Sequence, residues 1–380
     1  MIKLKSSIKS RAPEPWVAAY IRLRSSVGAC VAGICSRSAG LAAIYFLVTG
    51  TFSREHRSVL AGRNAYHHSM RSPISTSSFL RRSIHRLEKG LISQPRREIF
   101  ATLYIGETVR TFAQLAVRAG CALPREGELR WAHDVLAEYF SVCAPHPAID
   151  SARAEFDAIA PRLALEPRPN ALVPSSREST LVSSVSSEEF HRLSIQRRSV
   201  RWFLRKHVPR DCIDSALLTA RLAPSACNRQ PFRFVIYDDP DLVQKIARVP
   251  GGTVGFADNF PSIALVLGRL DGLASDRDRH LIYVDASLAS MAFMLALETH
   301  GISSCPINWP DVNHAENELA GIVGLEAYER PIMLIAMGFA DPRAFVPASE
   351  KLPLSELRTF NRVRMVARRA DPAPDVGGSR

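Results

Sequence analysis

Three arginines and a serine cluster in the short sequence Arg197-Arg198-Ser199-Val200-Arg201. Guanidinium groups form charge-assisted, often bidentate hydrogen bonds with phosphate oxygens, and a serine hydroxyl can add one more. Arg197 and Arg201 are four residues apart, so they share one face if the segment is helical. The cluster could therefore grip a phosphate, although an arginine-rich run is more often a solvated surface.

A second polar cluster lies in a proline-bounded loop at residues 223–232. It offers the hydroxyl of Ser225 and the amides of Asn228 and Gln230. Planar amides can donate to and accept from the edge of a heteroaromatic ring. In the alternative interpretation the loop is a turn in which these side chains cap the preceding helix. Cys227, in the same loop, is interpreted as a packed small residue rather than a reactive thiol.

These two motifs, about 25 residues apart, together resemble motifs of the flavin-dependent nitroreductase family. The run Asp285-Ala-Ser-Leu-Ala-Ser-Met-Ala-Phe-Met-Leu-Ala is similar to that family's central helix. Gly301-Ile-Ser-Ser-Cys-Pro-Ile-Asn-Trp-Pro resembles its flavin-facing loop, and Ile335-Ala-Met-Gly-Phe its last core strand. The resemblance covers residues 190–364 and implies the family's fold and FMN, but no particular substrate.

The resemblance also assigns binding roles residue by residue. It implies FMN contacts at Arg197, Arg198, Ser199 and Arg201 for the phosphate and ribityl chain, at Asn228 and Gln230 for the ring, at Pro306, Ile307 and Asn308 over the flavin, and at Lys351 as a second phosphate contact. Family members commonly carry an acidic residue and a glycine where this chain has Asn308 and Trp309. Trp309 is therefore predicted to narrow the substrate pocket or to stack on the ligand.

The activity implied by the resemblance is transfer of a hydride from NADH or NADPH through bound FMN to a small acceptor in the same pocket. Neither a G-x-G-x-x-G nor a P-loop sequence occurs, which fits a nicotinamide that only lies on the flavin. No residue is predicted to be a catalytic acid or base, and no metal site is predicted. The resemblance further implies a homodimer with each flavin at the subunit interface.

The charged string Arg81-Arg-Ser-Ile-His-Arg-Leu-Glu-Lys-Gly-Leu stands apart from these motifs. His85, Glu88 and Lys89 would share a helical face and could form a polar patch near the flavin or at a subunit contact. The alternative is an exposed, salt-bridged helix. The string resembles the N-terminal extension of nitroreductase-like proteins encoded with bacterial exopolysaccharide machinery, which implies a context in exopolysaccharide biosynthesis.

The elements that must position these residues alternate between helices and strands without strict βαβ units. This pattern predicts an α+β fold, with a mixed sheet flanked by helices and a mainly helical N-terminal extension. Ser186-x-x-Glu189 predicts a capping box at the start of a helix. Periodicity predicts helices at 212–222, 240–249, 282–300, 313–325, 128–139 and in two runs within 81–115, and strands at 232–237, 262–267 and 332–337. The apolar face expected for 282–300 consists of Leu288, Met291, Ala292 and Leu295.

Prolines from Pro145 to Pro174, followed by seven serines between 175 and 187, predict an exposed linker or strap. The predicted organisation is a basic and apolar segment at 1–60, a helical extension at 61–160, a linker at 161–187, an FMN-binding domain at 188–365 and a disordered tail at 366–380.

The formal net charge of +12 comes mainly from residues 1–185, which carry 25 Lys and Arg against 14 Asp and Glu. A basic excess alone gives only unspecific attraction, so no specific nucleic-acid partner is predicted. Seven cysteines without a C-x-x-C pair favour a reducing compartment, and hence the cytoplasm. The apolar stretch 25–53 is interrupted by Arg37 and is short for a membrane span. It is interpreted as a buried or partner-facing helix with anchors at Tyr45–Leu47, or as a site of membrane association.

Three classes of function stay open from the sequence. The favoured class is an FMN-dependent oxidoreductase. The second is a catalytically weak flavin-binding or scaffolding accessory protein of polysaccharide biosynthesis, in which Trp309 blocks turnover. The third is a basic adaptor that binds a membrane or nucleic acid through residues 1–185.

Overall fold

The computed structural model describes residues 14–71, 78–119, 126–163, 170–177 and 182–361 of the chain. The chain divides into two units, residues 1–344 and residues 345–380. The predicted tail at 366–380 lies outside the described residues. In the second unit, the described part contains the short helix α14 (Leu354–Leu357), and Lys351 is exposed.

The first unit contains a four-stranded sheet in the order β1-β2-β4-β3. Its strands, all paired antiparallel, are β1 (Phe232–Tyr237), β2 (Ser262–Arg269), β3 (Ser303–Asn308) and β4 (Glu329–Gly338). Among the described residues, parallel pairing is limited to an isolated bridge between Ser199 and Ser304. The predicted α+β class is confirmed, and the sheet is mixed only through that bridge.

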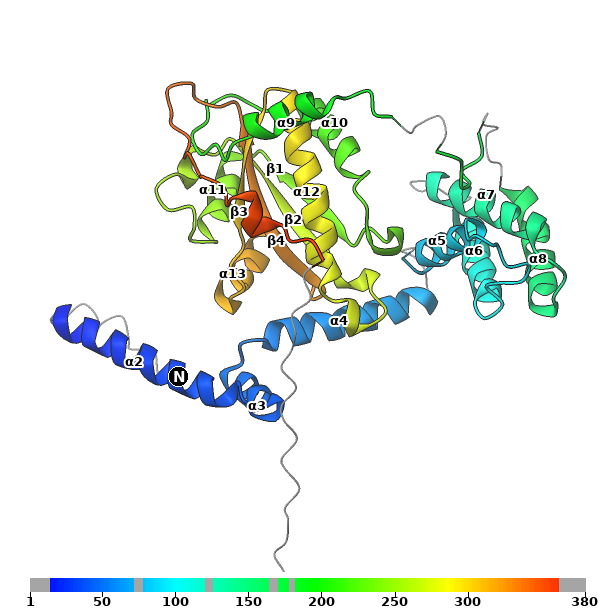
Figure 1. The fold of residues 1–380 in the computed structure, drawn as a ribbon, viewed down its shortest axis with the longest axis horizontal. Coiled ribbons are helices and arrows are strands. Elements are labelled where there is room, and N and C mark those ends of the chain that lie inside the picture. The colour runs from blue at the N-terminus through cyan, green and yellow to red at the C-terminus, as the bar shows by residue number, and fades with distance from the viewer. Residues whose placement is uncertain (1–13, 72–77, 120–125, 164–169, 178–181, 362–380) are drawn as a thin grey trace, which may run out of the picture. The chain divides into compact units, whose positions relative to one another are not determined.

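Helices cover both faces of the sheet (Figure 1). One face packs against α10 (Arg210–Ala220) and α12 (Leu281–Thr299), and the other against α11 (Pro240–Arg248) and α13 (Asn313–Val323). Side chains of the central strand β2 alternate between the two layers, because successive strand residues point to opposite faces. Ala264 and Val266 contact the α12 layer, whereas Ile263 and Leu265 contact the α11 layer.

The face of α12 that packs on the sheet differs from the predicted one. Phe293, Met294 and Leu297 are buried, whereas the predicted core residues Leu288 and Met291 are exposed. The sequence of α12 is apolar around most of its circumference, so periodicity could not select the buried side. The prediction of the helix itself is confirmed within one residue at each end.

The predicted capping box is confirmed at the start of α9 (Ser187–Gln196). Ser186 Oγ accepts a hydrogen bond from the Glu189 backbone N–H at 3.1 Å, and the Glu189 carboxylate accepts one from Ser186 N–H at 2.9 Å. These two bonds satisfy donors that the first helical turn leaves without partners. Because α9 ends at Gln196, the polar motif at 197–201 begins directly after it.

Before the sheet, the helices α5 (Ser78–Leu91), α6 (Ile105–Ala119), α7 (Glu126–Val142) and α8 (Pro147–Ile159) share a hydrophobic core of their own. Helix α8 includes Pro147, one of the prolines from which an exposed linker was predicted, but it lies within the predicted helical extension at 61–160 and before the predicted linker at 161–187. Pro147 occupies the first helical position, where its missing N–H costs nothing. Ile149, Ala152 and Phe156 then bury one face of this helix.

Helix α4 (Ser53–Arg71) packs against the short turn η5 (Leu270–Gly272) at the end of β2. A Cβ on Gly62 would lie 2.5 Å from the Leu270 Cβ, so only glycine permits this approach. Arg54 adds an ion pair with Glu316 and a 2.8 Å hydrogen bond to Asn317 Oδ1. Glu316 also pairs with the buried Arg330 at 3.1 Å.

The chain before α4 forms α2 (Glu14–Cys35) and α3 (Ala39–Thr49). No residue of α3 is buried in the described structure. Of the interpretations of this segment, the buried helix is not observed, and the partner-facing helix with anchors at Tyr45–Leu47 and the membrane association stay predictions. In the described part of the chain, only the helical stretch 276–299 is long and apolar enough to cross a membrane. Half of that window is buried, because it contains the core helix α12.

Candidate functional site

The motif at 197–201 runs beside the start of β3. Its backbone leaves the helical conformation at Arg197, where ψ is 110°, and Val200 N–H donates to the Ser304 carbonyl at 3.1 Å. The segment is therefore not helical, and the shared helical face that Arg197 and Arg201 would have in a helix does not form. The segment is extended and is held against the edge strand β3.

The motif lies near the buried thiol of Cys305. Burial raises the pKa of that thiol, while the charges of Arg201 and Arg197 and a hydrogen bond with Ser199 oppose the rise. Arg201 also lies over the Phe256 ring, with 5.6 Å between the guanidinium carbon and the ring centroid. Within the motif, Arg201 Nη1 donates a hydrogen bond to the Ser199 carbonyl at 3.3 Å.

Arg197 carries the feature that best fits an anion. Its Nε is buried and has no hydrogen-bond partner among the described residues. A buried donor without an acceptor costs free energy unless a ligand or water supplies one. The charge of Arg197 also acts on Glu298, whose pKa is raised by burial and lowered less by Gln196 and Arg197. A phosphate oxygen would satisfy the Nε donor.

The loop at 225–230 brings Asn228 and Gln230 together. Gln230 Nε2 donates to Asn228 Oδ1 at 2.9 Å, and Gln230 N–H donates to Ser225 Oγ at 3.1 Å. Cys227, Asn228 and Gln230 all have positive φ, between 50° and 55°. Backbone in this region is uncommon for residues other than glycine and persists only where the surroundings hold it.

Asp285 and Arg229, two residues that the sequence analysis did not single out, hold this loop in place. Asp285 of α12 accepts a hydrogen bond from Ala226 N–H at 3.0 Å. The buried Arg229 donates to the Ala226 carbonyl at 3.0 Å and pairs with Asp278 at 3.1 Å. Burial raises the pKa of Asp285, and the bond from Ala226 and the charge of Arg229 oppose the rise. In the sequence, the position of Arg229 inside an otherwise uncharged loop was the signal that could have identified this residue.

Arg81 of α5 also forms a hydrogen bond with this loop. Its Nε donates to the Asn228 carbonyl at 2.8 Å, so a residue of the N-terminal helices contacts a predicted flavin-binding position. Arg81 also pairs with Glu128 at 3.5 Å and lies 5.5 Å from the Trp131 ring centroid. These three partners around one guanidinium would be costly to rearrange.

Two residues of the predicted polar patch at His85, Glu88 and Lys89, namely His85 and Glu88, make contacts within the helices α5 to α8. His85 Nδ1 lies 3.5 Å from the Glu88 carboxylate, and Trp131 Nε1 donates to the same carboxylate at 2.9 Å. Glu88 thereby links α5 to α7. The predicted role of the patch near a flavin or a second subunit stays a prediction.

The remaining predicted residues lie at the end of β3. Ile307 is buried, Asn308 is exposed and Pro306 is half-buried. Trp309 packs into the core on the α11 side of the sheet, and its indole N–H has no hydrogen-bond partner among the described residues. Its predicted place in a substrate pocket stays a prediction. Lys351 belongs to the second unit and is described only there.

The two motifs lie near opposite ends of α12. Gln196, which precedes the first motif, donates to Glu298 at 3.1 Å, and the second motif is held by Asp285. These two α12 residues are 13 positions apart, which at 1.5 Å per residue is about 20 Å. Within one chain, the two motifs predicted to bind the flavin are therefore far apart.

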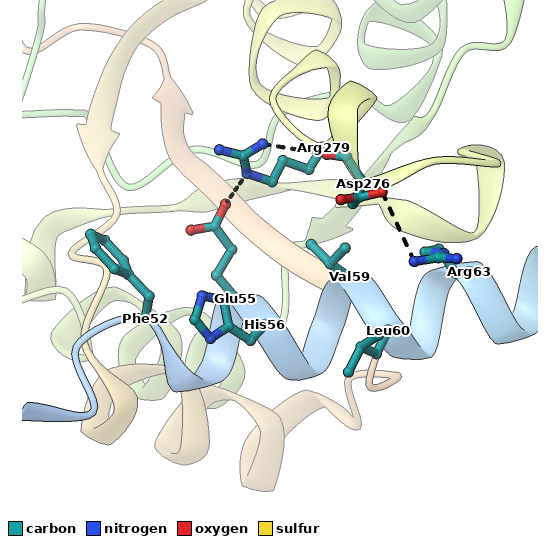
Figure 2. A pocket seen from close by; sticks show the side chains of 8 residues that line it. All are labelled: Phe52, Glu55, His56, Val59, Leu60, Arg63, Asp276 and Arg279. Carbon is teal, nitrogen blue, oxygen red and sulfur yellow. Dashed lines mark hydrogen bonds and ion pairs between the residues drawn. The ribbon is translucent and has the colours of Figure 1, made fainter. Parts of the chain in front are cut away.

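A cavity of about 660 Å³ lies elsewhere, between α4 and the turn η6 (Asp276–Asp278) (Figure 2). Its lining residues are Phe52, Glu55, His56, Val59, Leu60, Arg63, Asp276 and Arg279. Both arginines have acidic partners there, since Arg279 lies 3.3 Å from Glu55 and Arg63 lies 3.9 Å from Asp276. No residue of the two polar motifs at 197–201 and 225–230 lines this cavity.

The nitroreductase family model matches residues 195–254 and 250–339. This stretch is a nitroreductase-family domain. It contains both polar motifs, α12, β3 and β4, whereas the helices α2 to α8 precede it.

Among curated proteins, the chain is similar to iodotyrosine deiodinase 1 of Pongo abelii, with 26% identity over 202 residues, covering 45% of this chain and 68% of the relative. It is also similar to the iodotyrosine deiodinase of Haliscomenobacter hydrossis, with 25% identity over 187 residues, covering 42% and 83%.

Two solved structures are similar to the same part of the chain. An FMN-dependent nitroreductase from Clostridium difficile R20291 has 21% identity and a TM-score of 0.37, with 44% of this chain and 96% of that chain covered. A nitroreductase family protein from Streptococcus pneumoniae TIGR4 has 22% identity and a TM-score of 0.39, with 45% and 99% covered.

Proposed function

We propose that the nitroreductase-family domain binds FMN and transfers a hydride from NADH or NADPH to a small acceptor. The observation that carries the proposal is the buried, unsatisfied Nε of Arg197 beside Ser199 and Arg201. FMN, when bound, would supply the redox chemistry, which no side chain of the protein can supply.

The residues of this chain would bind and orient the cofactor. Arg197, Arg198, Ser199 and Arg201 would hold the phosphate. The amides of Asn228 and Gln230 would hold the ring edge, and their strained backbone keeps both side chains in one place. Residues 306–308 would supply backbone groups at the flavin. No side chain is assigned as a general acid or base.

A homodimer is part of this proposal, because one chain holds the two motifs about 20 Å apart. Between them, α12 exposes the apolar side chains of Val284, Leu288 and Met291, with 48%, 46% and 40% of their surface accessible. If two copies pack these stripes together about a two-fold axis, their α12 helices run antiparallel. The first motif of one copy then lies beside the second motif of the other.

Two experiments test the proposal. The first is the visible absorption spectrum of the purified full-length protein, before and after anaerobic addition of NADH or NADPH. We expect a flavin band that bleaches. In the double variant Arg197→Ala/Arg201→Ala, loss of two charged hydrogen-bond donors should weaken FMN binding about 100-fold. Arg205→Ala, an exposed arginine of the same segment, is the control. Unchanged FMN affinity in the double variant would remove the phosphate assignment.

The second experiment asks whether each site is built from two copies. The Arg197→Ala/Arg201→Ala chain and an Asn228→Ala chain are co-expressed, so that mixed dimers form. In a mixed dimer one site would combine both defects and the other would have neither. Random mixing should then restore about a quarter of the wild-type flavin sites. If both motifs act within one chain, mixing restores none.

Two candidate functions differ in the acceptor that would oxidise the reduced flavin. The curated relatives are iodotyrosine deiodinases, which favours a halogenated tyrosine or phenol as the second candidate acceptor beside nitroaromatic compounds. Oxidation of reduced flavin by iodotyrosine, but not by a nitroaromatic compound, would select the halogenated acceptor. Bound FMN that neither NADH nor NADPH reduces would instead favour the accessory role in polysaccharide biosynthesis.

A further inference from the structure

The helix α3 and the second half of α2 present apolar side chains to solvent. Every described residue of α3 is at least partly accessible, and Leu47 and Val48 expose 78% and 80% of their surface. Val27, Val31 and Ile34 of α2 are exposed as well. The sequence of α3, Ala-Gly-Leu-Ala-Ala-Ile-Tyr-Phe-Leu-Val-Thr, contains no charged residue. Soluble proteins rarely expose contiguous apolar surface of this kind without a partner.

The neighbouring helix α4 shows that this exposure is specific to α2 and α3. Gly62 lets α4 approach the Leu270 backbone closely, and Arg54 joins it to the buried Glu316. In contrast, a Cβ added at Gly28 or Gly33 of α2 would meet no neighbouring atom of the described residues within 4 Å. The chain therefore docks one helix onto the domain and leaves the apolar pair before it uncovered.

The lengths of the apolar helices limit what can cover them. The uncharged apolar runs are Ser26–Cys35 and Ala39–Thr49, and Arg37 lies in the turn between them. At 1.5 Å per residue, the 11 residues of α3 span about 16 Å, roughly half of a bilayer's hydrocarbon core. Neither apolar run is long enough to cross a bilayer alone, but both can lie in its surface layer, where Arg37 reaches the phosphate groups.

Charge favours an anionic surface over a second copy of the chain. Residues 1–50 carry seven Lys and Arg, at positions 3, 5, 9, 11, 22, 24 and 37, and one acidic residue, Glu14. Two such segments would repel each other across a two-fold axis. Anionic lipid headgroups attract each nearby basic residue by about 1 kcal/mol, in addition to the apolar burial.

We propose that α3 and the second half of α2 bind the surface layer of an anionic phospholipid bilayer. The apolar side chains, with Leu47 and Val48 the most exposed, enter the acyl boundary, and the basic residues contact the headgroups. Helix α4, fixed to the domain by Gly62 and Arg54, then tethers the nitroreductase-family domain to the membrane. This proposal does not depend on FMN binding.

The test is flotation of the full-length protein with vesicles of phosphatidylcholine alone, or of phosphatidylcholine mixed with an equal share of phosphatidylglycerol. We expect flotation with the anionic vesicles and much less with the neutral ones. In Leu47→Gln/Val48→Gln the bound fraction at limiting lipid should fall at least about tenfold, because two buried apolar side chains are lost. Leu103→Gln/Val117→Gln, which alters two exposed apolar residues of the α5–α8 region, is the matched control and should float like the wild type.

Thermal unfolding of both double variants should match the wild type, which separates lost lipid binding from lost folding. Equal flotation of the Leu47/Val48 variant and the wild type would overturn the proposal, as would equal binding to neutral and anionic vesicles. No flotation, together with a self-association that the Leu47/Val48 variant abolishes, would show that a second copy covers these helices instead.

Discussion

Two helical regions precede the sheet. One buries its apolar side chains in a core of its own, and the other leaves them exposed. The helices α5 to α8 bury Leu80, Phe112, Tyr139 and Phe156 in a shared core and turn charged residues outward. Helix α3 buries nothing in the described structure and has no charged face to turn outward. An amphipathic helix can bury its one apolar face against a single partner, whereas a helix without a charged face leaves apolar surface exposed wherever it lacks a partner. The first region packs on itself, and the second has no buried residue in the described structure.

The helix between them, α4, follows neither rule. It joins the domain through a close backbone approach at Gly62 and a charged contact at Arg54, and its apolar contribution to the interface is small. Glu316, which accepts Arg54, is nearly inaccessible and also faces Arg330. A buried ion pair adds little net stability, but removing one member leaves a costly unpaired charge. The contact therefore fixes where α4 sits more than how strongly the domain folds.

The largest effect is expected in the core of α5 to α8. Phe112 is fully buried and packs 5.7 Å from the Phe156 ring centroid. Phe112→Ala should lower the free energy of unfolding of this region by about 3–5 kcal/mol, through lost burial and the cavity left behind. Leu47→Ala on α3 should change it by less than about 0.5 kcal/mol. Denaturant unfolding measures both, and similar losses would show that α3 has a partner within the chain.

A smaller effect should separate two helical glycines. Gly62→Ala places a Cβ 2.5 Å from Leu270 Cβ and 2.7 Å from its backbone, so α4 must shift at a cost of about 1–3 kcal/mol. Gly28→Ala in α2 meets no described atom within 4 Å and should stabilise that helix by up to about 1 kcal/mol. Thermal unfolding compares the pair. If the two substitutions shift the transition in the same direction, the docking of α4 is not as described.

The sequence predicted local features of this fold better than contacts between distant segments. The strand at 232–237 and the capping box at Ser186 depend on neighbouring residues, and both are confirmed. The buried side of α12 depends on the sheet it packs against, and its prediction was wrong. The extended course of Arg197 to Arg201 depends on the same sheet, and the sequence left it open. Of the site, the sequence predicted the residue types, but nothing in it placed Arg81 against Asn228, because 147 residues separate them.

The smallest effect tests whether α5 to α8 serve the site as well as their own core. Arg81→Met removes the 2.8 Å hydrogen bond to the Asn228 carbonyl while keeping a long side chain beside Trp131. If the loop then relaxes its positive φ angles, FMN affinity should fall several-fold, up to about tenfold. Arg86→Met, on the same helix, loses its stacking on Tyr104 and makes a matched control. Fluorescence titration with FMN measures both variants. Equal affinities would leave α5 to α8 as a separate region that only touches the site, whereas a selective loss in Arg81→Met would make them part of its scaffold.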